Sequence, residues 1–421
     1  VGSEMCIRDS SYAALAAIAI QSNQNDQHGG QSVVDFDYAM AEGGRYTYQK
    51  YLKEGYEICE RLNDLKDKEW ILDYAMEKTT RDTYQAMEGL IHNLNTMHSR
   101  AGAQVPFSSI NYGTDISWEG RLAIEQLLLA TEAGLGNGET PIFPIQIFRV
   151  KEGVNYNPDD PNYDLFELAM KVSAKRLFPN FAFIDAPFNL QYYKPGHPET
   201  EVAYMGCRTR VMGNVYDPSR EIAPGRGNLS FTSINLPRLG IKSKGDYLTF
   251  FKLLDKMLDA TMQQLLDRYK IQASRIVRNF PFLMGEGVWM DSDGLSPDDT
   301  VGEVLKHGTL SIGFCGLAEC LVALNGKHHG EDEFSQELGL RIVGYIRDYC
   351  NRKSTELGMN VTCLATPAES LAGRLLRSDR ERYGIIKGVT DREYYTNSFH
   401  VPVYYHLPAL KKIDIEAPYH A

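Results

Sequence analysis

Hydrophobic and polar positions along the chain alternate between a helical period and a strand period. Residues 82–98 place apolar side chains three or four positions apart, which indicates a helix with one apolar face. Residues 105–113 have the composition of a strand that ends in glycine, and residues 119–133 return to helical spacing. Residues 140–150 then place Phe, Ile and Ile on one face and are expected to form the next strand.

The alternation continues to the far end of the chain. A helix is expected near 163–177, a strand at 180–187 and a long amphipathic helix at 246–269. Residues 309–326 indicate a strand, a turn and a helix that stops at glycine. Regular strand–helix alternation is typical of parallel strands joined by crossover helices, so the pattern predicts an α/β fold.

Two of the expected strands resemble each other in sequence. "VPFSSINYG" begins at residue 105 and "LSFTSINLPR" begins at residue 229, with several strand–helix units between them. The echo is open to two explanations, which are chance similarity and equivalent strands in two halves of one barrel.

Composition narrows the classes of partner. The chain has 421 residues, of which 43% are hydrophobic, and its net charge is −11. The basic residues are scattered and form no stripe, which argues against nucleic acid or an anionic membrane surface as a partner. No apolar run approaches the roughly 20 residues of a membrane span.

Seven cysteines occur at irregular spacing without a CxxC pair, which fits neither a disulfide framework nor a zinc ribbon. We expect a cytoplasmic protein because a reducing cytosol suits this usage best, and we predict no metal site. Residues 1–10, "VGSEMCIRDS", carry no periodicity and are interpreted as an artefact outside the fold. The next stretch lacks the flanks of a signal peptide and is expected to be helical.

"AYMGCRTRV" contains the cysteine with the most unusual neighbours. Cys207 follows Gly206 and is flanked by Arg208 and Arg210. Free cysteines are commonly buried and inert, but neighbouring cations favour the thiolate and a reactive sulfur. A buried thiol, a metal ligand and a chemically active sulfur all remain open at this point. Cys315 and Cys320 lie among apolar residues and are expected in the core.

Two further segments carry polar groups next to glycine or proline. Asn228 follows "GRG" and opens a strand, where it is either a turn residue or an amide that bonds a vicinal diol. In "TPAES", Thr366 is predicted to cap a helix, with Glu369 completing a capping box. The alternative is that free amides at Ala368, Glu369 and Ser370 hold a phosphate.

Other glycine-rich or histidine-rich stretches carry weaker signals. "AGLGNGETP" (133–141) has the wrong order for a dinucleotide loop and is expected to be a turn. "GKHHGEDE" (326–333) is expected to be a surface loop, not a metal site. The glycine-bearing turns at 28–32 and 98–108 are candidates to line a cleft.

Together these stretches resemble the anaerobic (class III) ribonucleotide reductases, a family of glycyl radical enzymes. The resemblance runs from about residue 11 to the end and rests on eight ordered segments. They are "QNDQHGGQS", "HSRAGAQVPFSSINYGTD", "GLGNGETPIFPIQIF", "YMGCRTRV", "GRGNLSFTSINLPR", "GFCGLAECLVALNGKHHGE", "TPAESLAGR" and "DREYYTNSFHVPVYY". The resemblance implies a ten-stranded α/β barrel made of two parallel five-stranded halves, with residues 11–421 as its catalytic core.

The resemblance also implies roles for residues. Cys207 matches the thiyl-radical cysteine of a finger loop, and Asn228 matches an asparagine near the ribose hydroxyls. The "TPAES" segment, with Thr366, Ala368, Glu369 and Ser370, matches the place where substrate phosphates bind. Glu369 is either a capping residue or a carboxylate in the chemistry of the reductant. The implied reaction reduces ribonucleoside triphosphates to 2′-deoxyribonucleoside triphosphates.

The family also implies cofactors and partners. The expected cofactor is a glycyl radical, which is made by an activating enzyme that uses S-adenosylmethionine and an iron–sulfur cluster. The expected reductant is formate or a small redoxin. The expected effectors are ATP and deoxynucleotides, and the expected oligomer is a homodimer. No glycyl radical motif, zinc-binding CxxC pairs or ATP-cone is present in the sequence, so we expect the barrel part of a longer enzyme that is inactive alone. Two alternatives are another glycyl radical enzyme, of formate-lyase or dehydratase type, and a non-catalytic nucleotide-binding relative.

Overall fold

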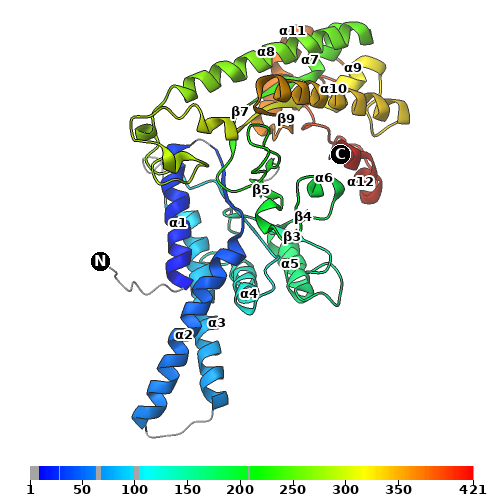
Figure 1. Cartoon of the computed structure of the whole chain (residues 1–421). Coiled ribbons are helices and arrows are strands. Elements are labelled where there is room, and N and C mark those ends of the chain that lie inside the picture. The colour runs from blue at the N-terminus through cyan, green and yellow to red at the C-terminus, as the bar shows by residue number, and fades with distance from the viewer. Residues whose placement is uncertain (1–8, 28, 63–67, 99–103, 207–208, 421) are drawn as a thin grey trace. The chain divides into compact units, whose positions relative to one another are not determined.

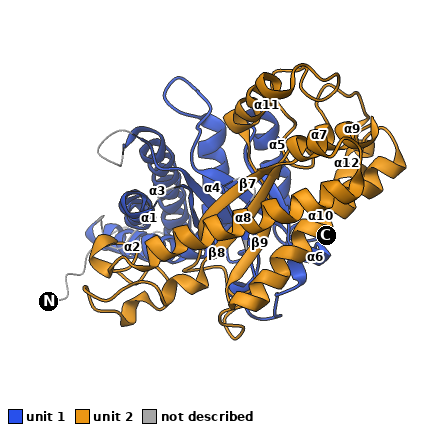
Figure 2. Cartoon of the chain, turned by 90° about the horizontal axis from the view of Figure 1, so that it is seen from above, with its two compact units in different colours: residues 1–212 blue, residues 213–421 orange. Residues whose placement is uncertain are grey.

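The computed structural model describes residues 9–27, 29–62, 68–98, 104–206 and 209–420. The chain divides into two compact units, residues 1–212 and residues 213–421, shown in blue and orange in Figure 2. Each unit contains a parallel sheet with helices joining its strands, as the alternation in the sequence predicts. The α/β fold is therefore confirmed, and each unit is described by itself below.

The first unit contains a four-stranded parallel sheet in the order β1-β2-β3-β4, of which β3 and β4 are labelled in Figure 1. Its strands are β1 Gln31–Val33, β2 Ser108–Tyr112, β3 Ile145–Val150 and β4 Asn180–Phe183. Its helices are α1 Asp9–Asp26, α2 Phe36–Leu62, α3 Lys68–Thr96, α4 Trp118–Ala133, α5 Tyr163–Arg176 and the short α6 Pro187–Leu190. An antiparallel pair, β5 Ala203–Met205 and β6 Thr209–Val211, follows after one 3-10 turn at Pro198–Thr200.

The second unit contains a three-stranded parallel sheet in the order β7-β8-β9. Its strands are β7 Asn228–Asn235, β8 Thr309–Cys315 and β9 Asn360–Ala365. Its helices are α7 Leu236–Ser243, α8 Tyr247–Ala273, α9 Leu317–Asn325, α10 Glu333–Leu357, α11 Glu369–Tyr383 and α12 Ala409–Glu416. Short 3-10 turns occur at Val277–Asn279, Ser292–Gly294, Val304–His307 and Ala417–His420.

Burial of apolar side chains explains why the helices pack against each sheet. In the first unit Ile110 and Tyr112 of β2 and Phe148 of β3 are fully buried in one core with residues of α1, α3 and α4. In the second unit Ile312 of β8 and Leu254 of α8 are fully buried in the equivalent core. Removing such apolar area from water is the main force that holds helix against sheet.

The two similar sequence segments each form a parallel strand, one in each unit. "SSIN" at 108–111 lies in β2 and "TSIN" at 232–235 lies in β7. β2 lies between β1 and β3, whereas β7 is the first strand of its sheet and pairs with β8. The resemblance implied five strands in each half, whereas the described residues form four in the first sheet and three in the second.

Most element predictions are confirmed, and some need correction. The structure has helices and strands where residues 119–133, 163–177, 246–269 and 309–326 predict them. The strand expected at 140–150 begins only at Ile145, after a cis peptide bond between Phe143 and Pro144. The interpretation of residues 1–10 as an artefact is wrong for Asp9 and Ser10. They are the first residues of α1, and Asp9 is buried with its carboxylate bonded to Thr83.

Residues 326–332 form the expected loop before α10, with Lys327 and Glu331 exposed. The burial of its histidines is a correction, because His328 and His329 are both buried. His329 Nε2 bonds the Phe399 carbonyl at 2.7 Å, and the His328 ring packs edge-on against Tyr405. Burial lowers the pKa of His329 to about 4, so its imidazole is neutral near pH 7.

Within the described residues, no helix combines the length and apolar character needed to cross a membrane. The same residues contain no group of three or more His, Cys, Asp or Glu side chains arranged to hold a metal ion.

Candidate active site

The hairpin that carries Cys207 is the first part of the candidate site. Strands β5 and β6 pair antiparallel, with Tyr204 opposite Arg210. Gly206 has φ +63°, a left-handed conformation that glycine adopts without the steric cost of a Cβ. Cys207 itself lies outside the described residues, so its role as a reactive sulfur stays a prediction.

The side chain of Asn111 on β2 binds both backbone groups of Tyr204. Its Oδ1 accepts from the Tyr204 N–H at 2.8 Å, and its Nδ2 donates to the Tyr204 carbonyl at 2.8 Å. Ser32 Oγ on β1 donates to the same carbonyl at 3.0 Å. Asn111 is fully buried. Because both ends of one buried amide are paired with a single residue, the hairpin has a fixed position against β2.

Ser109, two residues before Asn111, holds the hairpin at a second point. The Gly206 N–H donates to Ser109 Oγ at 3.1 Å, and that hydroxyl donates to the Gln31 carbonyl at 3.0 Å. The residues one and three positions before Cys207 are therefore both tied to the first sheet. One feature of the sequence pointed to this segment, the "SSIN" echo, but its polar side chains were not predicted to bind the hairpin.

A buried cluster of charges fixes the chain just before β5. Arg149 at the end of β3 is 1% exposed and pairs with Asp35 at 2.8 Å, Asp37 at 3.5 Å and Glu201 at 3.6 Å. Lys151 also binds Glu201. Burial raises the pKa of Asp35. A buried arginine is tolerated only when it is paired, so this cluster anchors the arm that leads into the hairpin.

Arg210 was expected to favour a thiolate at Cys207. In the structure its guanidinium donates to Asn189 Oδ1 at 2.7 Å and lies 4.8 Å from the centre of the Phe188 ring. Both partners belong to α6, so Arg210 holds the second hairpin strand against that helix. Its charge is already engaged by a side-chain amide and an aromatic ring.

The second part of the candidate site is the polar face of the second sheet. Leu310, Ile312 and Phe314 of β8 point into the helix-covered core. The alternate residues of β8 therefore face the other way. Ser233 is paired in register with Gly313 and so shares that opposite face.

A β-bulge places Asn228 on the same face as Ser233. Asn228 pairs with Thr309 and Ser230 pairs with Leu310, so two residues of β7 are matched to one of β8. The extra residue, Leu229, packs into the core beside the helices. Without the bulge the strict alternation of the strand would turn Asn228 toward the helices. Within the described residues, no side-chain hydrogen bond engages the Asn228 amide, which is half-buried.

Thr366 occupies a different place from the one predicted. The residue is 1% exposed, and its hydroxyl bonds Ser233 Oγ at 2.8 Å beside Gly313, where any Cβ would overlap Thr366 Oγ1. Helix α11 begins at Glu369, with Ala368 at the N-cap position and no side-chain cap. The predicted capping box is therefore wrong, because the Thr366 hydroxyl is taken by the sheet and lies outside the helix start.

The amides at the start of α11 are only partly available. The Ala368 N–H, expected to be free, donates to Asn397 Oδ1 at 3.0 Å. Glu369 and Ser370 are exposed, and within the described residues their N–H groups have no acceptor. Glu369 has φ +34°, a left-handed conformation that costs a non-glycine residue free energy. Two unpaired amides at a helix N-terminus form a ready site for an anion.

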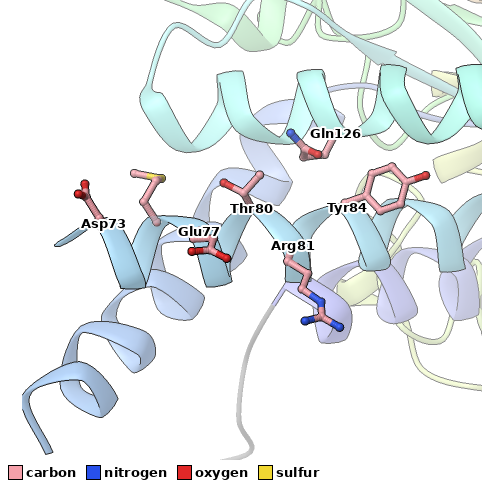
Figure 3. A pocket seen from close by; sticks show the side chains of 7 residues that line it. Asp73, Glu77, Thr80, Arg81, Tyr84 and Gln126 are labelled. Atoms are coloured by element: carbon pink, nitrogen blue, oxygen red, sulfur yellow. The ribbon is translucent and has the colours of Figure 1, made fainter. Parts of the chain in front are cut away.

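The other two cysteines considered in the sequence belong to the core, and the groove along α3 lies apart from the predicted site residues. Cys315 and Cys320 are fully buried, as predicted, and burial raises the pKa of the Cys315 thiol to about 12. An open groove of about 510 Å³ lies along α3 and faces α4 at Gln126 (Figure 3). Its ionic side chains are Asp73, Glu77 and Arg81, an acidic balance that does not suit a triphosphate. None of the predicted site residues lines it.

Comparison with known proteins places these observations in a family. The family model for anaerobic ribonucleoside-triphosphate reductase matches residues 7–421. The anaerobic ribonucleoside-triphosphate reductase of Escherichia coli (strain K12) is 34% identical over 414 residues, which cover 97% of this chain and 56% of that protein. The reductase of enterobacteria phage T4 is 32% identical over 417 residues, which cover 97% of this chain and 64% of the phage protein.

Solved structures show the same fold. The anaerobic ribonucleotide reductase from Thermotoga maritima with glycerol in its active site matches 99% of this chain and 62% of that one, with TM-score 0.64 and 17% identity. The same enzyme in complex with dATP and CTP also matches with TM-score 0.64. The chain spans little more than half the length of its bacterial relatives. Because the family model covers almost every residue, the chain belongs to the family of anaerobic ribonucleoside-triphosphate reductases.

Proposed function

We propose that this chain forms the catalytic core of an enzyme that reduces ribonucleoside triphosphates to 2′-deoxyribonucleoside triphosphates under anaerobic conditions. The observation that carries the proposal is the family match over residues 7–421. The tether of the Cys207 hairpin supports it, because a group that transfers a hydrogen atom must be held within contact distance of its target.

Cys207 is the residue that exchanges hydrogen with the substrate. As a thiyl radical its sulfur takes the hydrogen atom from C3′ of the ribose and becomes a thiol. The 2′-hydroxyl then leaves as water after it gains a proton, two electrons and a further proton arrive from the reductant, and the Cys207 thiol returns its hydrogen atom to C3′. The net reaction consumes two electrons and two protons and releases one water.

Asn228 orients the ribose. Its amide offers a donor and an acceptor to two neighbouring hydroxyls, and the bulge directs it to the polar face of the sheet. The phosphates bind at the start of α11, where the amides of Glu369 and Ser370 are unpaired. Ser233, the partner of Thr366, lies on the same face of β7 as Asn228.

The cofactors and partners follow from the family and are part of this proposal. A glycyl radical, formed by a radical S-adenosylmethionine activating enzyme, supplies the oxidising equivalent to Cys207. Formate or a small redoxin supplies the electrons, zinc is held in a segment outside this chain, and ATP and deoxynucleotides act as effectors on a cytoplasmic homodimer. Glu369 is exposed, so its carboxylate is accessible to a reductant as well as to the helix terminus.

Titration of this chain with CTP and with cytidine tests the proposal. We expect saturable binding of CTP that is tighter than binding of cytidine by tenfold or more. A Ser370→Asp variant is expected to lower the affinity for CTP about tenfold, because a carboxylate beside the phosphates costs about 1.4 kcal/mol or more. The same carboxylate should stabilise the isolated helix start by about 0.5 kcal/mol, so the melting temperature should not fall.

The changes in CTP affinity and in melting temperature together distinguish a phosphate site from an ordinary helix start. If Ser370→Asp raises the melting temperature and leaves CTP binding unchanged, the phosphates do not bind at α11. Equal affinities of the wild-type chain for CTP and cytidine would contradict the proposed substrate class.

A further inference from the structure

The β-bulge at the start of β7 determines which way Asn228 points. Asn228 pairs with Thr309 and Ser230 pairs with Leu310, so Leu229 is the extra residue. A shift of the pairing by one residue would remove the bulge and turn Asn228 toward the helices. Strand pairing holds this bulge on one side only, because β7 begins at Asn228. Contacts made by the residues before the two strands must therefore hold its other side.

Gly308 provides the space into which Leu229 packs. A Cβ at Gly308 would lie 2.6 Å from Leu229 Cγ and 2.7 Å from its Cδ2, which is closer than carbon atoms approach without a bond. Gly308 has φ −78°, which any residue adopts, so a side chain is excluded here by space and not by backbone conformation. Leu229 in turn packs against two apolar clusters of the second unit. A larger residue at position 308 would occupy the place of the extra residue of the bulge.

The contacts between β7 and β8 continue beyond the first residues of the two strands. The Thr309 N–H donates to the Gly227 carbonyl at 3.0 Å. Arg226 Nε donates to the His307 carbonyl at 3.1 Å. Both bonds lie on the N-terminal side of the bulge, so a slip of Asn228 by one residue would break them.

The Arg226 guanidinium also binds two earlier parts of the chain. Its two terminal nitrogens donate to the Ile222 carbonyl at 3.0 Å and to the Gly213 carbonyl at 2.9 Å. Burial lowers the pKa of Arg226 to about 10, so its side chain stays charged near pH 7. A planar guanidinium directs its donors to three separate carbonyls, whereas the compact ammonium of lysine does not match that fork. Arg226 therefore fixes the segment that leads into Asn228 to the start of β8.

We propose that Arg226 and Gly308 are positioning residues for the substrate ribose, because they hold the bulge of β7 in register and the bulge presents Asn228 to the 2′- and 3′-hydroxyls. This inference rests on the proposed function, since it takes Asn228 to bind the ribose. Both residues act through the direction of the Asn228 amide and not by contact with the nucleotide. Their replacement should weaken recognition of the hydroxyls and leave recognition of the phosphates unchanged.

The measured quantity is the affinity for CTP relative to that for 2′,3′-dideoxycytidine triphosphate, which has the same base and phosphates but lacks both hydroxyls. The wild-type chain should prefer CTP about tenfold, and Asn228→Ala should reduce this preference to about twofold or less. Gly308→Ala should have the same effect, because the new methyl group displaces Leu229. The double variant Gly308→Ala with Leu229→Ala removes that overlap and should recover roughly half of the preference. Affinity for the dideoxy compound should stay within about twofold of the wild type throughout.

Arg226→Lys keeps the positive charge and loses the fork of donors. It should lower the preference for CTP about threefold and speed hydrogen exchange at the Thr309 N–H. Arg380→Lys is the matched control, because Arg380 also donates to two backbone carbonyls in the same unit, those of Thr390 and Arg392. The control should keep the wild-type preference and the wild-type exchange rate at Thr309.

A second control addresses the glycine. A Cβ at Gly344 would meet no atom within 4 Å, so Gly344→Ala should leave both nucleotide affinities unchanged. If the Gly308→Ala chain does not fold, the measurement on Arg226→Lys decides the outcome.

The outcomes distinguish this inference from the proposed function. If Asn228→Ala removes the preference for CTP while Gly308→Ala and Arg226→Lys keep it, Asn228 binds the ribose and the two residues do not position it. If these two variants bind both nucleotides equally more weakly, their role is only structural and the inference is overturned. If the wild-type chain binds the two nucleotides equally, the proposed role of Asn228 fails, and the positioning role fails with it.

Discussion

The same short motif lies in one parallel strand of each unit, β2 and β7, yet its polar residues bind different parts of the protein. Ile110 and Ile234 are buried in the two cores, which is the shared structural task. In the first unit Asn111 and Ser109 hold the hairpin that carries Cys207. In the second unit Ser233 binds Thr366, which precedes α11.

The second asparagine of the pair shows the same divergence. Asn235 caps α7 by accepting from the Arg238 N–H at 3.3 Å, and it donates to the buried Asp379 at 2.7 Å. The strand pattern therefore determines which face of the sheet is polar, while the segment that packs on that face determines what the polar side chains do. In this account the first unit positions the radical residue and the second unit binds the phosphates.

The largest expected difference between the units is their response to acid. Burial raises the pKa of Asp9 to about 6, so the folded first unit holds a proton that the unfolded chain releases above about pH 4. Between pH 6 and 4 the folded state binds more protons, so acidification stabilises this unit. Asp9→Asn should be more stable than the wild type by about 3 kcal/mol at pH 7, with no advantage at pH 4.

The second unit should respond in the opposite direction. Burial lowers the pKa of His329 to about 4, so between pH 6.5 and 4 the unfolded state binds more protons and acidification destabilises the fold. His329→Gln keeps a donor for the Phe399 carbonyl and should gain about 3 kcal/mol over the wild type as the pH falls from 7 to 4. Urea unfolding of the wild type and both variants at pH 4 to 7 measures how the unfolding free energy of each changes with pH. Parallel pH profiles for the two variants would contradict this comparison.

A smaller effect is expected from the asparagines of the motif. Asn111→Ala leaves the N–H of the half-buried Tyr204 without its acceptor and should cost about 2 kcal/mol of unfolding free energy. Asn235→Ala removes a helix cap and one of the bonds to Asp379, and should cost about 1 kcal/mol. Only Asn111→Ala should speed hydrogen exchange at Tyr204. Unchanged exchange there would mean that the hairpin is held by other contacts.

The spacing of apolar residues predicted the helices that bury one face along their length. In α3, Met87, Ile91 and Leu94 lie three or four positions apart on one side, and the structure buries all three. Helices α2 and α10 were not predicted, and both contain glycine, which usually signals a break inside a helical segment. In the structure a Cβ at Gly43 would lie 3.0 Å from the Tyr12 ring, and one at Gly339 would overlap the Tyr419 hydroxyl. These glycines serve packing between segments distant in sequence.

The sequence analysis named the candidate residues that lie in short motifs. It did not name those whose role depends on contacts with residues far away in the sequence. The residues of "MGCR", "GRGN" and "TPAES" came from short sequence motifs. Asn111, Arg149 and Asn397 are defined by partners 93, 52 and 29 positions away, which no local pattern reveals. The capping box failed for the same reason, since Thr366 finds a hydroxyl 133 residues away in place of the helix terminus.

The most direct test of the account is the turnover of CTP by a full-length chimera in which this chain replaces the matching segment of the Escherichia coli relative. The assay is anaerobic, with the activating enzyme and reductant present, and dCTP is the measured product. The account predicts turnover by the chimera, a glycyl radical signal of equal size in its Cys207→Ser variant, and no dCTP from that variant, with CTP affinity unchanged. Continued dCTP formation by Cys207→Ser would contradict the assignment of Cys207 as the residue that exchanges hydrogen with the substrate.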